Sequence, residues 1–421
     1  DLPPPEPHLV DVALLDMHHG WPNLGHEALV DVVQSAVCDM REELVPAGLS
    51  VRVLSYDVRR GRVLPEHPGG PHALYVGTGG PGHLDPRSND GRDGSQGIIE
   101  DPAWEAPLFA LFDAIRDDPD ASLIAVCHSF GVMCRWLDVA EPVLRGPERG
   151  GKSVGVRQNR LLPAGKRHPW FSRFAAELRD GERFPVLDNR LYDLVPTGAA
   201  PAGVRLLAVD CDDKGIATDA VTMVEAAGVA DDGVPRILGV NHHPEIVNRQ
   251  RQMALLEKKR VRGDVDETWF KERWAALTGQ VEDEVDDRLL HLTSHYTLMG
   301  PIRAALRREV HRRAASPRVS GDTVEMAKIK DVTKKAVTRA KAGAKAGSKA
   351  VKRAVQSASK AVTTARTKAS KLATKAVEKF SPTAKRRKKV KRALATAGAV
   401  AGAAAVAVAG VAAARAKTKK R

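Results

Sequence analysis

The sequence predicts an α/β fold, with a mostly parallel sheet and helices on both of its faces. Short apolar runs typical of buried strands alternate with helical stretches along residues 8–250. Three of these strands, 73–76, 122–126 and 236–240, are followed by Gly77, by Cys127 and by the stretch Asn241-His242-His243. Because the carboxyl ends of parallel strands share one edge of a sheet, these three endings predict a functional site there.

The individual elements follow from apolar runs that are bounded by turn residues. Strands are expected, in order, at 10–15, 51–56, 73–76, 122–126, 154–156, 186–188, 204–209, 220–224 and 236–240. Helices are expected at 26–46, at 108–116, at 132–140 and from Pro169 onward. Residues 83–101 are rich in Gly, Asp, Arg and Ser, and we expect them to form a mobile surface loop beside the site.

Charge divides the chain into an acidic body and a basic tail. Residues 318–421 contain 29 Lys and Arg against 4 Asp and Glu, which leaves 37 basic and 48 acidic residues in 1–317. Together with the helical pattern after residue 250, this division predicts four segments. They are an α/β domain at 8–250, a helical appendage at 251–317, a basic Lys/Ala-rich tail at 318–392, and an Ala/Val/Gly-rich apolar segment with a basic end at 393–421.

The basic tail is similar in composition to linker-histone-like bacterial tails. Its lysines predict non-specific contact with DNA phosphates or with an anionic membrane. Residues 393–414 carry no charge and would span roughly 33 Å as a helix at about 1.5 Å per residue. Two interpretations of this segment stay open: membrane association, or an alanine-rich extension of the tail.

The cysteines and the first residues indicate the compartment. The four cysteines have no metal-binding or disulfide spacing, and residues 1–7 lack the basic and apolar stretches of a secretory signal. We therefore expect a cytoplasmic protein with reduced thiols, attached to the nucleoid or a membrane only through its tail. No metal and no cofactor is expected.

Cys127 is the candidate nucleophile, because it follows the strand 122–126 at the turn into the next helix. A strand that turns sharply into a helix lifts the side chain at the turn clear of the sheet and directs backbone N–H groups toward it. The helix N-terminus also favours a thiolate. A cysteine at the end of a strand is often only a small buried apolar residue, so the neighbouring motifs are needed as support.

Two such motifs flank Cys127 in the order of a known family. Gly79-Gly80-Pro81-Gly82 precedes it, and His243-Pro244-Glu245 follows it. With these motifs, residues 8–250 resemble a class I glutamine amidotransferase domain. The resemblance implies a flavodoxin-like fold and a catalytic triad, in which Cys127 is the nucleophile, His243 the base and Glu245 the residue that orients the imidazole.

The resemblance also implies the chemistry. Gly79, Gly80, His128 and Ser129 would form the oxyanion and substrate-binding site, with the backbone N–H groups of Gly80 and His128 as donors. The substrate would be glutamine or a related γ-glutamyl amide, hydrolysed through a cysteine thioester with release of ammonia. No ammonia-accepting synthetase domain is evident, so we expect a synthetase on a separate chain or a simple amide hydrolase.

Several positions depart from the family pattern. Ser129 and Gly131 stand where the family usually has glycine and glutamine, and residues 189–196 lack the histidine of its His-x-Asp-x-Val stretch. Two alternatives therefore stay open. In one, the fold is a degenerate amidotransferase that acts as a nucleic-acid- or membrane-associated module through its tail. In the other, Ser129 is the nucleophile of an α/β-hydrolase, because the stretch 127–131 is close to a G-x-S-x-G motif.

Overall fold

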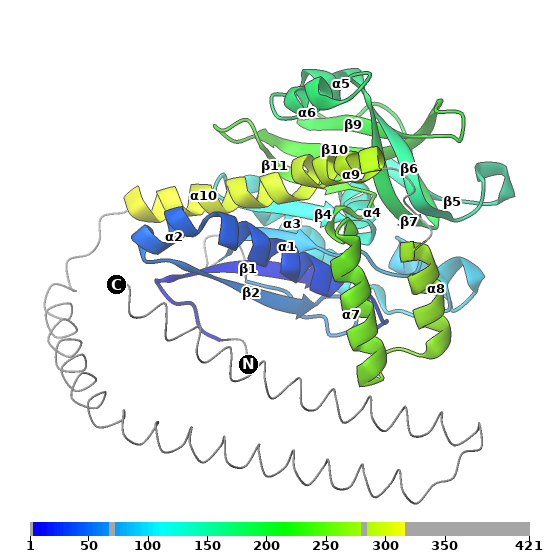
Figure 1. Ribbon diagram of the computed structural model, residues 1–421, viewed down its shortest axis with the longest axis horizontal. Coiled ribbons are helices and arrows are strands. Elements are labelled where there is room, and N and C mark those ends of the chain that lie inside the picture. The colour runs from blue at the N-terminus through cyan, green and yellow to red at the C-terminus, as the bar shows by residue number, and fades with distance from the viewer. Residues whose placement is uncertain (1–2, 67–71, 279–283, 316–421) are drawn as a thin grey trace, which may run out of the picture. The chain divides into compact units, whose positions relative to one another are not determined.

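The computed structural model describes residues 3–66, 72–278 and 284–315 (Figure 1). Its centre is a nine-stranded sheet with the strand order β2-β1-β3-β4-β11-β10-β9-β6-β7. These strands are β1 Leu9–Asp16, β2 Ser50–Asp57, β3 His72–Gly77, β4 Ser122–Val126, β6 Ser153–Leu161, β7 Arg183–Arg190, β9 Val204–Cys211, β10 Ala217–Val229 and β11 Pro235–Val240. A second, antiparallel pair consists of β5 Ala140–Leu144 and β8 Tyr192–Pro196.

The first five strands of this order, β2-β1-β3-β4-β11, are parallel and have the flavodoxin-like order. The other four continue the sheet as antiparallel strands. The helices are α1 Gly25–Asp39, α2 Arg41–Ala47, α3 Glu105–Asp117, α4 His128–Trp136, α5 Pro163–Arg167, α6 Phe171–Glu177, α7 Arg249–Arg262, α8 Glu267–Thr278, α9 Glu284–Ser294 and α10 Gly300–Ala315. The predicted α/β fold is confirmed.

Apolar residues on the two faces of the sheet explain why helices cover both. Along β1, Val12 and Leu14 join one core with α1 and α10, whereas Ala13 and Leu15 join a second core with α3 and α4. Figure 1 shows α1, α2 and α10 together on the first of these faces. A strand that is apolar on both sides is stable only between two layers, and central parallel strands are of this kind.

Several regions differ from the elements expected from the sequence, and β8 and α5 were not predicted. The helix expected at 132–140 begins earlier, at His128, and it ends at Trp136, because Asp138 takes a φ of 53° that a helix cannot continue. Ala140 then begins β5, a strand that was not predicted. The helix expected at 26–46 is divided at Met40, whose ψ of 10° ends α1.

The loop 83–101, expected to be mobile, is held by buried polar contacts. The guanidinium of Arg59 pairs with the carboxylate of Glu100 at 2.6 Å, and both side chains are buried. The side-chain nitrogen of Asn89 donates to the same carboxylate at 2.8 Å. Since these partners are far from one another in sequence, composition alone does not indicate them.

The last helices belong to the core of the sheet. A π-helical turn, His295–Met299, joins α9 to α10, and α10 lies against β3 and β4. In this turn the carbonyl oxygen of Tyr296 accepts a hydrogen bond from Nε1 of Trp170 at 2.8 Å. A Cβ on Gly300 would lie 2.6 Å from Cζ2 of Trp170, so the indole packs there only because residue 300 is glycine.

The basic tail and the apolar segment lie outside the described residues, so contact with DNA or a membrane stays a prediction. Within the described residues, no helix combines the length and the apolar character needed to cross a bilayer.

Candidate active site

Cys127 lies between the last residue of β4 and the first residue of α4. Its φ of 52° and ψ of −102° form a backbone conformation that residues with side chains rarely adopt. The N–H of Cys127 donates to the carbonyl oxygen of Val240 at 2.8 Å, and Val126 is paired with Val240 in the sheet. The strained turn is therefore held against the end of β11, the strand that leads to His243.

The structure brings Cys127, His243 and Glu245 together at this edge of the sheet. Nδ1 of His243 lies 2.8 Å from Oε1 of Glu245. A Cβ on Gly79 would lie 3.0 Å from Cε1 of His243 and 3.8 Å from Sγ of Cys127, so the glycine loop lies directly against both side chains. Three stretches that are far apart in sequence thus converge because β3, β4 and β11 are parallel neighbours.

The charges of the three groups support one another. The side chain of Glu245 is fully buried and that of His243 is 13% exposed. Burial favours a neutral imidazole, but the Cys127 thiolate and the Glu245 carboxylate outweigh it and hold the pKa of His243 well above its usual range. Because Nδ1 faces Glu245, Nε2 is the nitrogen available to exchange a proton with the thiol.

This coupling predicts how His243 titrates. Cys127→Ala removes one anion and Glu245→Gln the other, so each variant should lower the pKa of His243 toward its ordinary value of about 6.5. At pH 7 the imidazole would then be largely neutral instead of protonated. NMR titration of the imidazole measures the shift, with the exposed His8 ring as an internal reference. An unchanged His243 titration in both variants would contradict the coupling.

The predicted oxyanion donors line the same cleft as Cys127. Within the described part of the chain, neither the N–H of Gly80 nor that of His128 donates a hydrogen bond to another residue. A Cβ on Gly80 would lie 2.3 Å from the carbonyl oxygen of Met17, so only glycine fits at this position. Gly79 lines the cleft as well. Because the N–H groups of Gly80 and His128 have no other acceptor among these residues, they are free to donate to an oxyanion in the cleft.

Ser129, in contrast, does not line the cleft. Its hydroxyl is buried and donates to the carbonyl oxygen of Thr78 at 2.6 Å. A Cβ on Gly77 would lie 2.4 Å from this hydroxyl oxygen, which places Ser129 against β3. This geometry corrects the expectation that Ser129 binds substrate and argues against the serine-hydrolase alternative. The strained turn presents Cys127 and not Ser129.

The glutamine of the family pattern has no room at its expected position. A Cβ on Gly131 would lie 2.4 Å from Cδ1 of Leu84, and Leu84 is one of the residues that line the cleft. Leucine from the loop 83–101 thus occupies the space above the first turn of α4.

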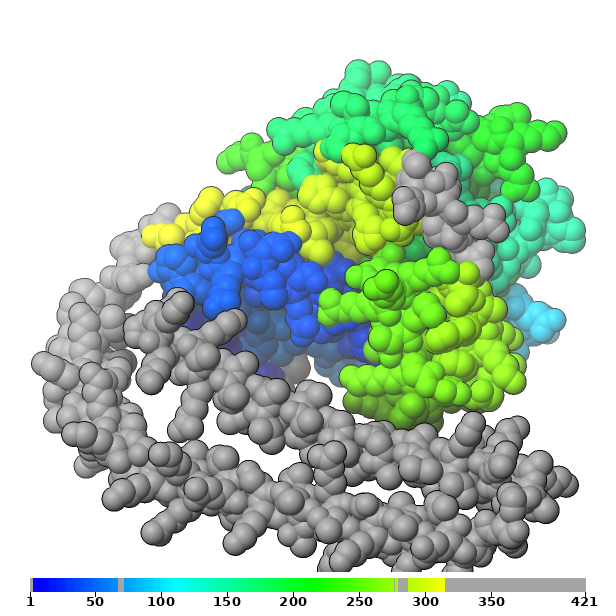
Figure 2. Space-filling model, in the orientation of Figure 1, coloured from blue at the N-terminus to red at the C-terminus, as the bar shows by residue number. Residues whose placement is uncertain are grey.

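The cleft around Cys127 has a volume of about 330 Å³. We call it the Cys127 cleft. Besides the predicted residues, it is lined by His18, by Lys152, and by Trp269, Glu272, Arg273 and Leu277 of α8. Figure 2 shows α7 and α8 beside α1 on the face in view, and Leu256, Phe270 and Leu277 pack these two helices together. Sequence reasoning missed this wall, since α8 carries no motif that connects it with Cys127.

The turn between α9 and α10 supports the loop that carries His243. The hydroxyl of Ser294 donates to the carbonyl oxygen of Pro244 at 2.6 Å. Nε2 of the preceding residue, His242, lies 3.3 Å from Oγ1 of Thr297. Burial lowers the pKa of His242 to about 3, so this imidazole is neutral and does not compete with its neighbour as a base.

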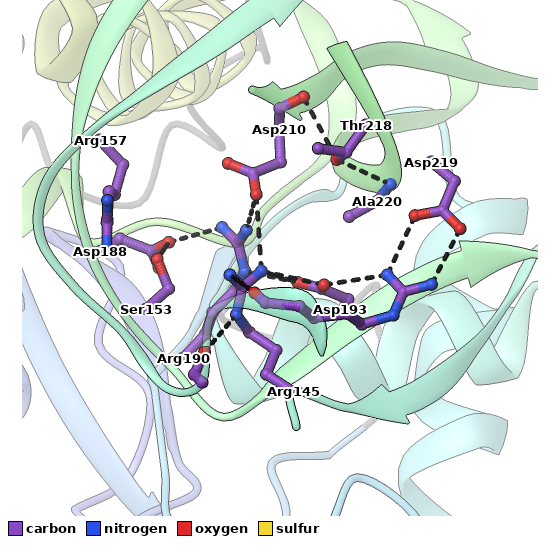
Figure 3. Close-up of polar contacts among 12 residues, drawn as sticks. Arg145, Ser153, Arg157, Asp188, Arg190, Asp193, Asp210, Thr218, Asp219 and Ala220 are labelled. Carbon is purple, nitrogen blue, oxygen red and sulfur yellow. Dashed lines mark hydrogen bonds and ion pairs between the residues drawn. The ribbon is translucent and has the colours of Figure 1, made fainter. Parts of the chain in front are cut away.

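A buried ion network surrounds Arg190 (Figure 3). The guanidinium of Arg190, 2% exposed, donates to Asp188 at 2.5 Å, to Asp193 at 3.0 Å and also to Asp210. Arg145 also donates to both carboxylate oxygens of Asp193, at 2.8 and 2.9 Å. Because both Asp188 and Arg190 line the cleft, the network fixes the position of their part of the wall.

The described residues show no arrangement of three or more His, Cys, Asp or Glu side chains that could hold a metal ion. Their chemistry is that of a thiol, an imidazole and a carboxylate, with two backbone donors nearby. Such a group can attack a carbonyl carbon, stabilise the oxyanion that results, and transfer the proton to a leaving group.

No known family model matches the chain, and no curated protein is significantly similar to it. Solved structures are similar only at low identity. The glutaminase domain of CTPS from Trypanosoma brucei, with bound acivicin, is 10% identical with a TM-score of 0.36, over 65% of this chain and 96% of that one. A putative ThuA-like protein from Bacteroides uniformis is 8% identical with a TM-score of 0.29, over 58% of this chain and 88% of that one. The carbohydrate deacetylase Agd3 is 12% identical with a TM-score of 0.29, over 58% of this chain and 31% of that one. These similarities are too weak to assign a family or an activity.

Proposed function

We propose that this protein hydrolyses an amide, glutamine or a related ω-amide, through a cysteine thioester. One observation carries the proposal: Cys127 sits in a strained turn, in a cleft that it shares with His243, and His243 is hydrogen-bonded to Glu245. Backbone strain persists where the surrounding structure holds it, and it concentrates at functional sites. A cysteine that served only as an apolar core residue would need neither this conformation nor this partner.

The reaction follows from the positions of these groups. The Cys127 thiolate adds to the amide carbonyl carbon, and the N–H groups of Gly80 and His128 face the oxygen that becomes negative. The His243 imidazolium gives its proton to the amide nitrogen, ammonia leaves, and a thioester remains on Cys127. Water then attacks the thioester while His243 takes up its proton, so that the acid is released and the Cys127 thiolate and His243 imidazolium are restored. Glu245 holds the imidazole in place through both steps.

Covalent capture tests this proposal. A chloroketone analogue of glutamine should alkylate Cys127 in the wild-type protein, and we expect labelling at least tenfold slower in His243→Ala, because the thiolate loses its imidazolium partner. Mass spectrometry of the labelled peptide identifies the site. The exposed thiol of Cys38 provides the control, since it should react equally slowly in both proteins. Labelling of Cys127 no faster than of Cys38 would refute an activated thiol.

Ammonia release completes the test. Glutamine and a set of ω-amides, including the monoamides of succinic and glutaric acid, would be incubated with the full chain. Capture without turnover of any amide would indicate another acyl substrate or a separate protein that accepts the ammonia.

A further inference from the structure

The charges that line the Cys127 cleft are not all paired. Glu245 is paired with His243, and Asp188 is paired with Arg190. His18, which also lines the cleft, is paired with Asp16 at 2.8 Å. The side chains that remain are those of Lys152, Arg273 and Glu272. The part of the cleft that is free to contact a ligand therefore carries more positive than negative charge.

Lys152 and Arg273 come from different parts of the fold and face the same space. Lys152 precedes β6, and Arg273 lies on α8. Neither side chain forms an ion pair with any residue that the structure describes, although Arg273 lies 5.5 Å from the ring of Trp269. Partial burial lowers the pKa of Lys152, and the nearby Arg273 guanidinium lowers it further, as a like charge does. The Cys127 thiolate and the Glu272 carboxylate act on Lys152 in the opposite direction. All four residues line the same cleft.

The Glu272 carboxylate acts on both cations but forms no ion pair with either among the described residues. The three side chains together keep a net positive charge, which a ligand with negative charge would balance. We infer that Lys152 and Arg273 form an anion subsite beside Cys127, and that the substrate is an amide whose acyl part carries a net negative charge. This inference rests on the proposed function, because it places the substrate carbonyl at Cys127. The monoamide of a dicarboxylic acid has this chemistry: one carboxylate binds the two cations, and the amide at the other end reaches the sulfur.

Two alkylating reagents that differ only in charge test the subsite. Iodoacetate carries a carboxylate and iodoacetamide is neutral, and in both cases the thiolate displaces iodide. The measured quantity is the ratio of their rates at Cys127, followed by mass spectrometry of its peptide. Neutralising either cation, in Lys152→Gln or Arg273→Gln, should lower the ratio about three- to tenfold. A change in the reactivity of the thiolate itself affects both rates and cancels in the ratio. High salt should lower the wild-type ratio in the same direction.

Two control variants distinguish the effect of the cations in the cleft from the effect of the overall charge of the protein. Lys271→Gln removes an exposed cation from α8 outside the cleft and should leave the ratio unchanged. Glu272→Gln removes the remaining acid of the cleft and should raise the ratio. A ratio that changes in only one of the two cation variants, or in neither, overturns the subsite. Slow iodoacetamide labelling of Cys127 in the wild-type protein would instead refute the activated thiol, so the two failures are distinguishable.

Discussion

Cys127→Ala is expected to lower the rate of amide hydrolysis at least about a thousandfold, because no other group in the cleft can form the acyl intermediate. Cys127→Gly should lower it equally. The two variants should nevertheless differ in stability, because residue 127 has a φ of 52° that glycine adopts without strain and alanine does not. We expect the free energy of unfolding of Cys127→Gly to exceed that of Cys127→Ala by about 1–2 kcal/mol. Urea unfolding of the two variants measures this difference.

This pair of variants separates chemistry from strain. Ser129→Ala provides the control for activity, since its hydroxyl donates to Thr78 and does not face the cleft. It should keep the hydrolysis rate within a few-fold of wild type. Activity that survives Cys127→Ala and disappears in Ser129→Ala would reverse the assignment of the nucleophile. Equal stability of the alanine and glycine variants would show that the turn at residue 127 stores no strain.

The second large effect is expected at Arg190. Arg190→Leu leaves the carboxylates of Asp188, Asp193 and Asp210 buried without this guanidinium, although Arg145 still contacts Asp193. Removing one partner of a buried ion network typically costs about 3–5 kcal/mol, because the charges that remain are uncompensated. Urea unfolding at pH 7 measures this loss. Arg157→Leu is the control: its partner Asp213 is 91% exposed, and such surface pairs contribute about 0–1 kcal/mol.

The pH dependence of the Arg190→Leu variant has a definite sign. In the wild-type protein burial already raises the pKa of Asp210, and the guanidinium opposes this effect. Without Arg190 the pKa of Asp210 should rise further, so that this carboxyl binds its proton more tightly in the folded than in the unfolded state. The contribution of Asp210 to stability is then greatest at low pH and is lost as pH rises from the unfolded pKa of about 4 through the raised folded pKa. The loss in the free energy of unfolding of Arg190→Leu relative to wild type should therefore grow between pH 4 and pH 7. A loss that became smaller over this range would contradict the network.

The local pattern was sufficient to predict the order of elements around the site. Apolar runs that end at Gly77, Cys127 and Asn241 predict parallel strands whose ends meet, and the structure has β3, β4 and β11 as neighbours in that arrangement. Parallel strands must be bridged by crossovers, which bring their carboxyl ends to one side whatever the loops contain. The convergence of Cys127, His243 and Glu245 could thus be expected from sequence, because it depends on chain direction alone.

Burial and direction of side chains could not be predicted in this way. Nothing local distinguishes Ser129, which turns into the sheet, from Cys127, which faces the cleft. The network around Arg190 joins β7, β8 and β9, whose pairing arises from long-range contacts. The position of α8 also depends on long-range contacts, because Arg273 lines the same cleft as Lys152 only when α8 packs on α7.

The sequence by itself determined the α/β order and the strand ends that carry Cys127, His243 and Glu245, since each depends on a short motif at a strand end. The tertiary structure alone decided what surrounds the sulfur of Cys127: Leu84 against Gly131, a strained φ at residue 127, and a wall that α8 contributes. The physical reason is that strand direction is a property of neighbouring residues in the chain, whereas the charge and shape of a cleft are set by groups that meet only on folding.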